Sequence, residues 1–206
     1  NLLVFFENHD TKRFNEYCPN IADYKLALTL ISTTRGIPQI YYGSEIGMKG
    51  SKDLGDADIR RDFPGGWAAD RHTAFCSSED GKCHAYQTGR TPEEEAYFQF
   101  TKSLLNWRKN NKIIHEGKLM QYVPENNVYV YARYKEPNGM YDMTGKQVVL
   151  VVINNSTKDE TIRWDRYAEM IKGKETGVDV ITNQTVNFDL KTAIIPAKTA
   201  YILELK

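Results

Sequence analysis

The stretch Leu2-Leu3-Val4-Phe5-Phe6-Glu7-Asn8-His9-Asp10 decides how the N-terminal part of the chain is interpreted. Its apolar residues, 2–6, follow one another without alternation, which is typical of a strand buried on both faces of a parallel sheet. The polar residues Asn8, His9 and Asp10 then stand at the carboxyl end of this strand, where a (β/α)8 barrel carries its functional side chains. Taken alone, the stretch favours a simpler interpretation, a strand followed by a turn, because Asn and Asp are ordinary turn formers.

A helix and a second strand are predicted next. An apolar stripe at helical spacing predicts a helix over residues 21–35, formed by Leu26, Ala27, Leu30 and Ile31. Gly36 suits the C-terminal end of that helix, and residues 37–42 form the next expected strand. The order strand, helix, strand with short connections indicates a βαβ unit and therefore a parallel sheet.

Three motifs resemble the α-amylase family, glycoside hydrolase family 13, in the order in which that family carries them. Residues 6–10, FENHD, followed by Arg13-Phe14, resemble its seventh-strand motif. Residues 36–47, GIPQIYYGSEIG, resemble its eighth strand, and residues 55–61, GDADIRR, resemble the loop that follows. Residues 58–67, DIRRDFPGGW, are similar to the neopullulanase and cyclomaltodextrinase branch. One short motif is a weak signal, whereas three in order are a strong one.

The resemblance implies a fold of the α/β class followed by an all-β part. Residues 1–112 would carry the last two βα units of a (β/α)8 TIM barrel, with strands 7 and 8, helices 7 and 8, and a long active-site loop over 43–91. The final helix is marked by Thr91-Pro92-Glu93-Glu94, in which Thr91 and Glu94 can form a capping box around Pro92 at the first helical position.

Residues 113–206 have a different composition, with short segments rich in Val, Ile, Thr and Tyr separated by Pro, Asn, Gly and Lys. This pattern predicts an antiparallel β-sandwich domain, which agrees with the C-terminal β-domain usual in the α-amylase family. The expected strands are 119–122, 128–134, 148–154, 161–164, 178–181, 186–190 and 199–205. Because residues 148–153 show no alternation, that strand is expected in the middle of its sheet.

The resemblance also implies roles for individual residues. Asp10 matches the carboxylate that stabilises the positively charged transition state of a retaining glycosidase, and is the candidate catalytic residue. His9, together with Asn8, matches the residues that bind the same sugar ring. Asp56 and Arg60 would bind sugar hydroxyls from two sides, because a carboxylate accepts and a guanidinium donates hydrogen bonds.

Each assignment has a simpler alternative. His9 would otherwise be a hydrogen-bonded core histidine, and Asp56 with Arg60 an ion pair on the surface. Arg61 is an alternative partner for Asp56. Trp67 and Tyr42 are candidate aromatic platforms for sugar, although most Trp and Tyr side chains are simply packed.

The nucleophile and the general acid/base of a retaining glycosidase have no counterpart here, because the resemblance places both on strands upstream of residue 1. Glu7 and Glu45 are not candidates for either role. The expected function is therefore that of a fragment of a retaining α-glucan hydrolase, inactive alone. The longer enzyme would cleave α-1,4 and, as an option, α-1,6 glucosidic bonds in maltooligosaccharides, cyclodextrins or pullulan. The alternatives are a non-catalytic carbohydrate-binding or structural module and a transglycosylase of the same family.

Composition limits the partners. Lys plus Arg and Asp plus Glu balance at 27 each, which gives no electrostatic reason to expect nucleic acid or an anionic membrane. No apolar run approaches the length of a membrane span. The expected partners are α-glucan oligosaccharides and, through exposed strand edges, a second copy of the chain. No cofactor or metal site is predicted, although calcium in the longer enzyme is an option.

The chain opens inside a predicted strand, and we interpret it as a piece of a longer polypeptide. Cys76 and Cys83 flank a turn-rich hexapeptide, so a disulfide and two thiols are both open alternatives. Relatives of the resembled branch often work in the periplasm. A periplasmic or extracellular location is therefore expected.

Overall fold

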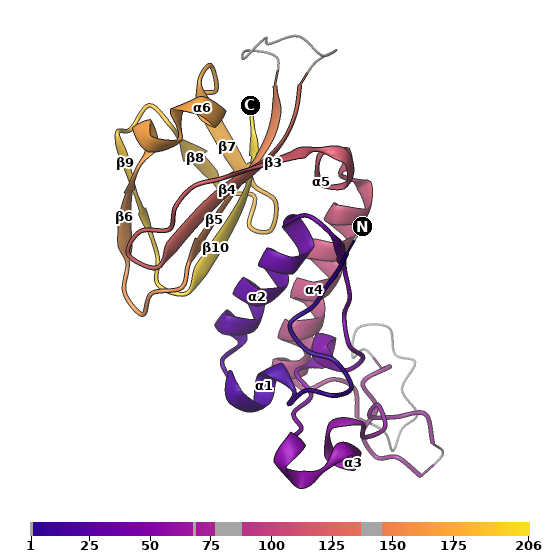
Figure 1. Cartoon of the computed structure of the whole chain (residues 1–206). Coiled ribbons are helices and arrows are strands. Elements are labelled where there is room, and N and C mark those ends of the chain that lie inside the picture. The colour runs from indigo at the N-terminus through magenta and orange to yellow at the C-terminus, as the bar shows by residue number, and fades with distance from the viewer. Residues whose placement is uncertain (1, 68, 77–87, 137–145) are drawn as a thin grey trace. The chain divides into compact units, whose positions relative to one another are not determined.

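The structure is a computed structural model that describes residues 2–67, 69–76, 88–136 and 146–206 (Figure 1). The chain divides into two compact units, and each is described by itself. One unit, 2–24 with 38–102, holds the Asn8–Asp10 stretch and the Asp56–Arg60 segment. The other, 25–37 with 103–206, holds the strands of the C-terminal half. Helix α2 spans Ile21–Thr33, and helix α4 spans Pro92–Asn110.

The two strands of the N-terminal part are shorter than predicted. β1 (Leu3–Val4) and β2 (Ile37–Pro38) form a two-stranded sheet, and the Gln39 N–H donates to the Val4 carbonyl oxygen at 2.9 Å. The expectation that residues 2–6 are buried on both faces is wrong for this chain, since Leu2 is 80% and Leu3 58% exposed. The sheet has only these two strands, and a pair of strands by itself buries little apolar surface.

Helix α2 ends two residues before the predicted position, and Gly36 has a φ of 117°. Two buried arginines bind the carbonyl oxygens at its C-terminal end. Arg108 donates to the Ser32 oxygen at 2.5 Å, and Arg133 donates to the Thr33 and Thr34 oxygens at 3.2 and 2.9 Å. The last carbonyls of a helix lack intrahelical partners, so these arginines satisfy groups that would otherwise be buried unpaired.

Helix α4 begins as predicted. The Thr91 Oγ1 accepts from the Glu94 N–H at 3.2 Å, and a Glu94 carboxylate oxygen accepts from the Thr91 N–H at 2.7 Å. This reciprocal pair confirms the capping box. A short helix that was not predicted, α5 (Lys112–Glu116), follows, with the Asn111 side chain accepting from the Ile114 N–H at 3.1 Å.

The predicted long loop contains short helical turns in its described part. After α1 (Phe14–Tyr17) and β2, these are η1 (Ser44–Ile46), η2 (Lys52–Leu54) and α3 (Asp56–Ile59). A Cβ atom on Gly50 would lie 2.6 Å from the Asp58 carbonyl oxygen, so only glycine permits this close approach of two segments. Residues 77–87 of the predicted loop lie outside the described residues.

The C-terminal half forms two antiparallel sheets, in agreement with the expected all-β domain (Figure 1). The larger sheet has the order β3-β4-β5-β10-β7-β8, and β6 pairs with β9 in the smaller one. The strands of the larger sheet are β3 (Lys118–Gln121), β4 (Val128–Lys135), β5 (Gln147–Asn154), β10 (Thr199–Leu205), β7 (Thr176–Asp179) and β8 (Thr185–Asn187). Those of the smaller sheet are β6 (Glu160–Arg163) and β9 (Thr192–Ile195). Strand β9 was not predicted.

One hydrophobic core joins the two sheets. It contains Leu150 of the central strand β5, Ile162 of β6, Ile195 of β9 and Leu203 of β10, together with Trp164. Trp164 opens η3 (Trp164–Tyr167), which leads into α6 (Ala168–Ile171), and both turns contribute to this core. The shared core supports the sandwich interpretation, and the position of β5 between β4 and β10 confirms that this strand is central. No described helix is long and apolar enough to span a membrane.

Candidate functional site

The stretch that follows β1 is a tight polar turn. The Asn8 side-chain oxygen accepts from the Asp10 N–H at 2.8 Å, and the Thr11 Oγ1 accepts from the Asn8 N–H at 3.0 Å. This turn leaves the His9 and Asp10 side chains 61% and 59% exposed, with the His9 Nε2 lying 3.1 Å from an Asp10 carboxylate oxygen. The turn predicted by the simpler interpretation is therefore present, and it presents both side chains to solvent.

Arg60 connects this turn to α3. Its Nη2 lies 2.9 Å from the Asp10 Oδ1 and 2.9 Å from the Asp56 Oδ2, and its Nε donates to the His9 carbonyl oxygen at 3.0 Å. One guanidinium therefore bridges two carboxylates that are 46 positions apart in the sequence. We call Asp10, Arg60 and Asp56, with His9 beside them, the Asp10–Arg60–Asp56 cluster.

The cluster is half-exposed and rich in both donors and acceptors. A hydrogen bond from Lys52, and then the charge of Arg60, hold the pKa of Asp56 below its ordinary value. Asp56 is therefore an anionic acceptor at neutral pH. Carboxylate oxygens, guanidinium N–H groups and an imidazole together match the alternating donors and acceptors of vicinal sugar hydroxyls.

Arg61 binds different groups from those that Arg60 binds. Its Nε donates to the Asp58 carbonyl oxygen at 3.1 Å, and its Nη2 donates to the Lys49 carbonyl oxygen. Neither interaction involves Asp10 or Asp56. Of the two adjacent arginines, Arg60 is the one that the fold brings to the cluster.

The two candidate aromatic platforms differ. Tyr42 is 38% exposed, its hydroxyl donates to the Arg61 carbonyl oxygen at 2.8 Å, and its ring packs edge-on against Tyr41 with centroids 4.6 Å apart. Trp67 is 67% exposed. Among the described residues, no ring contact joins Trp67 to the cluster, so its assignment as a sugar platform stays a prediction.

Arg13 connects three segments of this unit, and no local signal in the sequence indicates that role. Its Nε donates to the Ile59 carbonyl oxygen at 3.0 Å and its Nη1 to the Tyr42 carbonyl oxygen, while the guanidinium carbon lies 4.0 Å from the Tyr41 ring centroid. Arg13 is 0% exposed. It therefore ties the segment after β1 to the end of α3 and to the segment after β2.

Glu7 is the buried carboxylate closest to Arg13 in this arrangement, with Oε1 and Nη1 3.9 Å apart. It accepts hydrogen bonds from the Phe14 N–H and the Ser44 hydroxyl. Burial raises the pKa of Glu7, against the opposing effects of these hydrogen bonds and of Arg13. Glu7 is therefore a buried acceptor that connects its own segment to Phe14 and Ser44.

No metal site accompanies the cluster. Across residues 2–67, 69–76, 88–136 and 146–206, no group of three or more His, Cys, Asp or Glu side chains is arranged to hold a metal ion. Cys76 is disulfide-bonded, but its expected partner, Cys83, lies outside the described residues.

Individual relatives match most of the chain. A cyclomaltodextrinase from Thermoanaerobacter pseudethanolicus is 27% identical over 198 residues, which is 96% of this chain and 27% of that protein. A cyclomaltodextrin glucanotransferase from Geobacillus stearothermophilus is 28% identical over 91% of this chain and 23% of its own length. The chain therefore spans about a quarter of the length of these curated relatives.

Solved structures share the fold. The crystal structure of an Anoxybacillus α-amylase superposes with a TM-score of 0.72 at 23% identity, covering 99% of this chain and 38% of that one. An α-amylase from Geobacillus thermoleovorans, solved with acarbose, gives a TM-score of 0.67 at 21% identity over 100% of this chain and 39% of that one.

Family models divide the chain between them. The model of the α-amylase catalytic domain matches residues 2–117, and the model of the cyclo-malto-dextrinase C-terminal domain matches residues 119–204. These ranges do not test the predicted domain boundary at 112/113, which stays a prediction. Because the catalytic-domain model matches more than half of the residues, the chain belongs to the α-amylase family and carries a part of its catalytic domain followed by a cyclomaltodextrinase-type C-terminal domain.

Proposed function

We propose that this chain forms the C-terminal part of a retaining α-glucan hydrolase. In this proposal residues 1–112 supply the last two βα units of a (β/α)8 barrel, and residues 113–206 supply its β-domain. The observation that carries the proposal is the Asp10–Arg60–Asp56 cluster, since an exposed group of two carboxylates and a guanidinium lies just beyond β1. Functional side chains of such barrels lie beyond the carboxyl ends of the strands.

Asp10 is the proposed catalytic residue of this part. Its fixed negative charge would stabilise positive charge that develops at the anomeric carbon in the transition state. Arg60 and His9 hold its carboxylate at 2.9 and 3.1 Å, which pre-orients it without burying it. Asn8, His9, Asp56, Arg60, Tyr42 and Trp67 are proposed to bind the sugar units around it.

The nucleophile and the general acid/base are proposed to lie on upstream strands of the longer protein. The exposure of Leu2, Leu3 and Phe5 supports this view, because apolar residues on a strand ordinarily face neighbouring elements. The proposed substrates are maltooligosaccharides, cyclodextrins or pullulan, cleaved at α-1,4 and, as an option, α-1,6 bonds.

A second candidate function is transglycosylation by the same site. It is supported by the similarity to cyclomaltodextrin glucanotransferases, which are 28% identical over most of this chain. Water and a sugar hydroxyl attack the same glycosyl-enzyme intermediate, so the cluster suits either acceptor.

The test compares the longer protein with the 206-residue chain on maltoheptaose and β-cyclodextrin, with products followed by chromatography. We expect reducing sugar to appear only with the longer protein, because the proposal places the nucleophile and the acid/base upstream of this chain. Longer oligosaccharide products would favour the transglycosylase. Turnover by the isolated chain, or none by the longer protein, would contradict the proposal.

A further inference from the structure

The Asp10–Arg60–Asp56 cluster continues into one more charged side chain, that of Lys52. Each carboxylate of the cluster divides its two oxygens between two neighbours. Asp10 presents Oδ2 to the His9 Nε2 at 3.1 Å and Oδ1 to the Arg60 Nη2 at 2.9 Å. Asp56 presents Oδ2 to the same Arg60 Nη2 at 2.9 Å and Oδ1 to the Lys52 Nζ. Lys52 therefore stands at the end of a row of five side chains, each in contact with the next.

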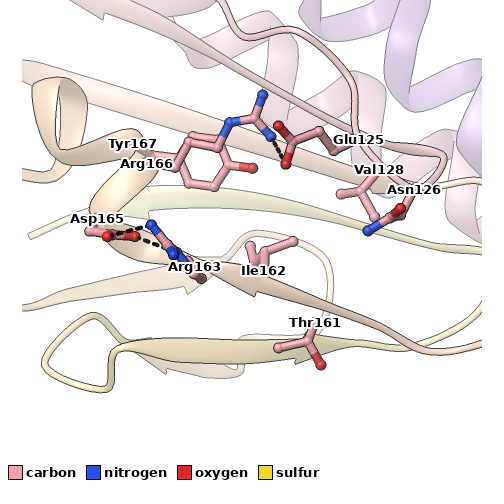
Figure 2. Close-up of a pocket in the computed structure, with 9 residues that line it drawn as sticks. All are labelled: Glu125, Asn126, Val128, Thr161, Ile162, Arg163, Asp165, Arg166 and Tyr167. Atoms are coloured by element: carbon pink, nitrogen blue, oxygen red, sulfur yellow. Dashed lines mark hydrogen bonds and ion pairs between the residues drawn. The ribbon is translucent and has the colours of Figure 1, made fainter.

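Ion pairs in the β-domain are built differently, as those around a cavity of about 510 Å³ show (Figure 2). Arg166 lies 2.5 Å from Glu125 there. Arg163 contacts the two Asp165 carboxylate oxygens at 3.2 and 2.9 Å. Each of these arginines is matched to one carboxylate, so the loss of one charge affects only its own partner. In a shared row, by contrast, a change at one end reaches the other members.

A glycine permits the contact between Lys52 and Asp56. Lys52 opens η2 and Asp56 opens α3, and Gly55 stands between the two turns with a φ of 95°. A side chain at Gly55 would meet no atom within 4 Å, so space is not what requires glycine here. The positive φ requires it, because L residues with a side chain rarely adopt this conformation. Lys52 reaches Asp56 across this junction.

The turn that carries Lys52 is itself held on two sides. The Ser51 Oγ accepts from the Asp53 N–H at 3.3 Å, and the Ser51 N–H donates to an Asp58 carboxylate oxygen at 2.6 Å. Lys12, in the segment after β1, lies 2.6 Å from an Asp53 carboxylate oxygen. The backbone beneath Lys52 is therefore supported both by α3 and by the segment after β1.

The contact with Lys52 limits how Asp56 pairs with Arg60. A carboxylate with both oxygens free takes two N–H groups of a guanidinium in a bidentate pair. Lys52 occupies the Asp56 Oδ1, so Oδ2 alone remains for Arg60. The Arg60 Nε then donates to the His9 carbonyl oxygen at 3.0 Å, and its Nη2 also reaches Asp10. Without Lys52, a bidentate pair with Asp56 would draw Arg60 away from Asp10.

We propose that Lys52 is a positioning residue of the sugar site, which holds one oxygen of Asp56 and thereby keeps Arg60 shared between Asp56 and Asp10. Lys52 acts through Asp56 and not on the sugar itself. In agreement, the hydrogen bond from Lys52 is the largest of the effects that hold the pKa of Asp56 below its ordinary value. The consequence for sugar binding rests on the proposed function, whereas the position of Asp56 rests on the contacts of Lys52 alone.

A carboxyl titration of the 206-residue chain by ¹³C NMR tests the position of Asp56. Lys52→Met removes the ammonium group, and Lys12→Met is the matched control, because Lys12 pairs with Asp53 of the same turn. We expect the pKa of Asp56 to rise in Lys52→Met and to keep its wild-type value in Lys12→Met. The pKa of Asp53, which the hydrogen bond from Lys12 lowers, should rise only in Lys12→Met. An unchanged pKa of Asp56 in Lys52→Met, or an equal rise in both variants, would overturn the proposal.

Kinetics of the longer protein test the consequence for sugar. Lys52→Met should raise the KM for maltoheptaose roughly two- to fivefold, the effect of losing one exposed ion pair, and lower kcat by a smaller factor. Lys52→Arg keeps a positive donor toward Asp56 and should restore the wild-type KM, and Lys12→Met should not change it. An unchanged KM in an active Lys52→Met enzyme would refute this role of Lys52 alone. Absence of glucan hydrolysis by the wild-type longer protein would refute the proposed function alone, since the titration of Asp56 tests Lys52 without any turnover.

Discussion

Arg13→Lys tests whether the buried guanidinium holds the candidate site together. Lysine keeps the charge, but its three N–H donors share one nitrogen, so it does not reproduce the planar guanidinium whose Nε and Nη1 donate to the Ile59 and Tyr42 carbonyl oxygens while it lies against the Tyr41 ring. A hydrogen bond from a charged group contributes roughly 1.5–3 kcal/mol. Losing one such bond and part of the ring contact predicts a destabilisation of about 3 kcal/mol.

Thermal unfolding of the 206-residue chain, followed by circular dichroism, measures this loss. At roughly 2–4 °C per kcal/mol, the midpoint should fall by about 6–12 °C. The matched control is Arg61→Lys, because Arg61 is 54% exposed and its ion pair with Asp58 should contribute less than about 1 kcal/mol. Equal shifts in the two variants, or no shift in Arg13→Lys, would refute the structural role given to Arg13.

Three further predictions concern the same part of the chain. Arg60→Ala in the longer protein should impair turnover of long maltooligosaccharides more than that of a short aryl glycoside, and equal losses in a kinetic comparison would speak against sugar binding by Arg60. Because the pKa of Glu7 is raised above 4.5, the folded state binds more protons there than the unfolded state, so this residue makes stability fall as pH rises above that value. Glu7→Gln should remove that part of the decline in a pH series of unfolding midpoints, and identical pH profiles would refute it. Thiol titration of the denatured, unreduced protein should find one reactive thiol if Cys76 pairs with Cys83, whereas three would exclude the bridge.

Local signals in the sequence were sufficient for two of the regular elements, α4 and β5. The capping box of Thr91 and Glu94 predicted the start of α4, because a helix cap depends on residues that are neighbours in the sequence. The continuous apolar run in β5 predicted its central position, because a strand buried on both faces needs apolar residues at every position. Strand β9 was missed, since its four residues lie just before Pro196 and make too short a run for a clear pattern.

Long-range contacts were predictable only through the resemblance. Nothing near Arg60 in the sequence indicates Asp10, 50 positions away, as its partner. The burial of Arg13 was also beyond local reasoning, because arginine is ordinarily exposed and its place depends on carbonyl oxygens of two distant segments. The prediction of a longer, fully buried β1 was wrong for a related reason. The length and burial of a strand depend on what lies beside it rather than on its own residues.

The central claim is that Asp10 acts on the transition state, and Asp10→Asn in the longer protein tests it most directly. Asparagine keeps an oxygen acceptor toward Arg60, so the fold and the cluster should persist in circular dichroism. Loss of a charge that acts in the transition state lowers kcat more than it changes KM. On maltoheptaose we expect kcat to fall by roughly 10²–10³ with little change in KM. A folded Asp10→Asn protein with the kcat of the wild type would contradict the account.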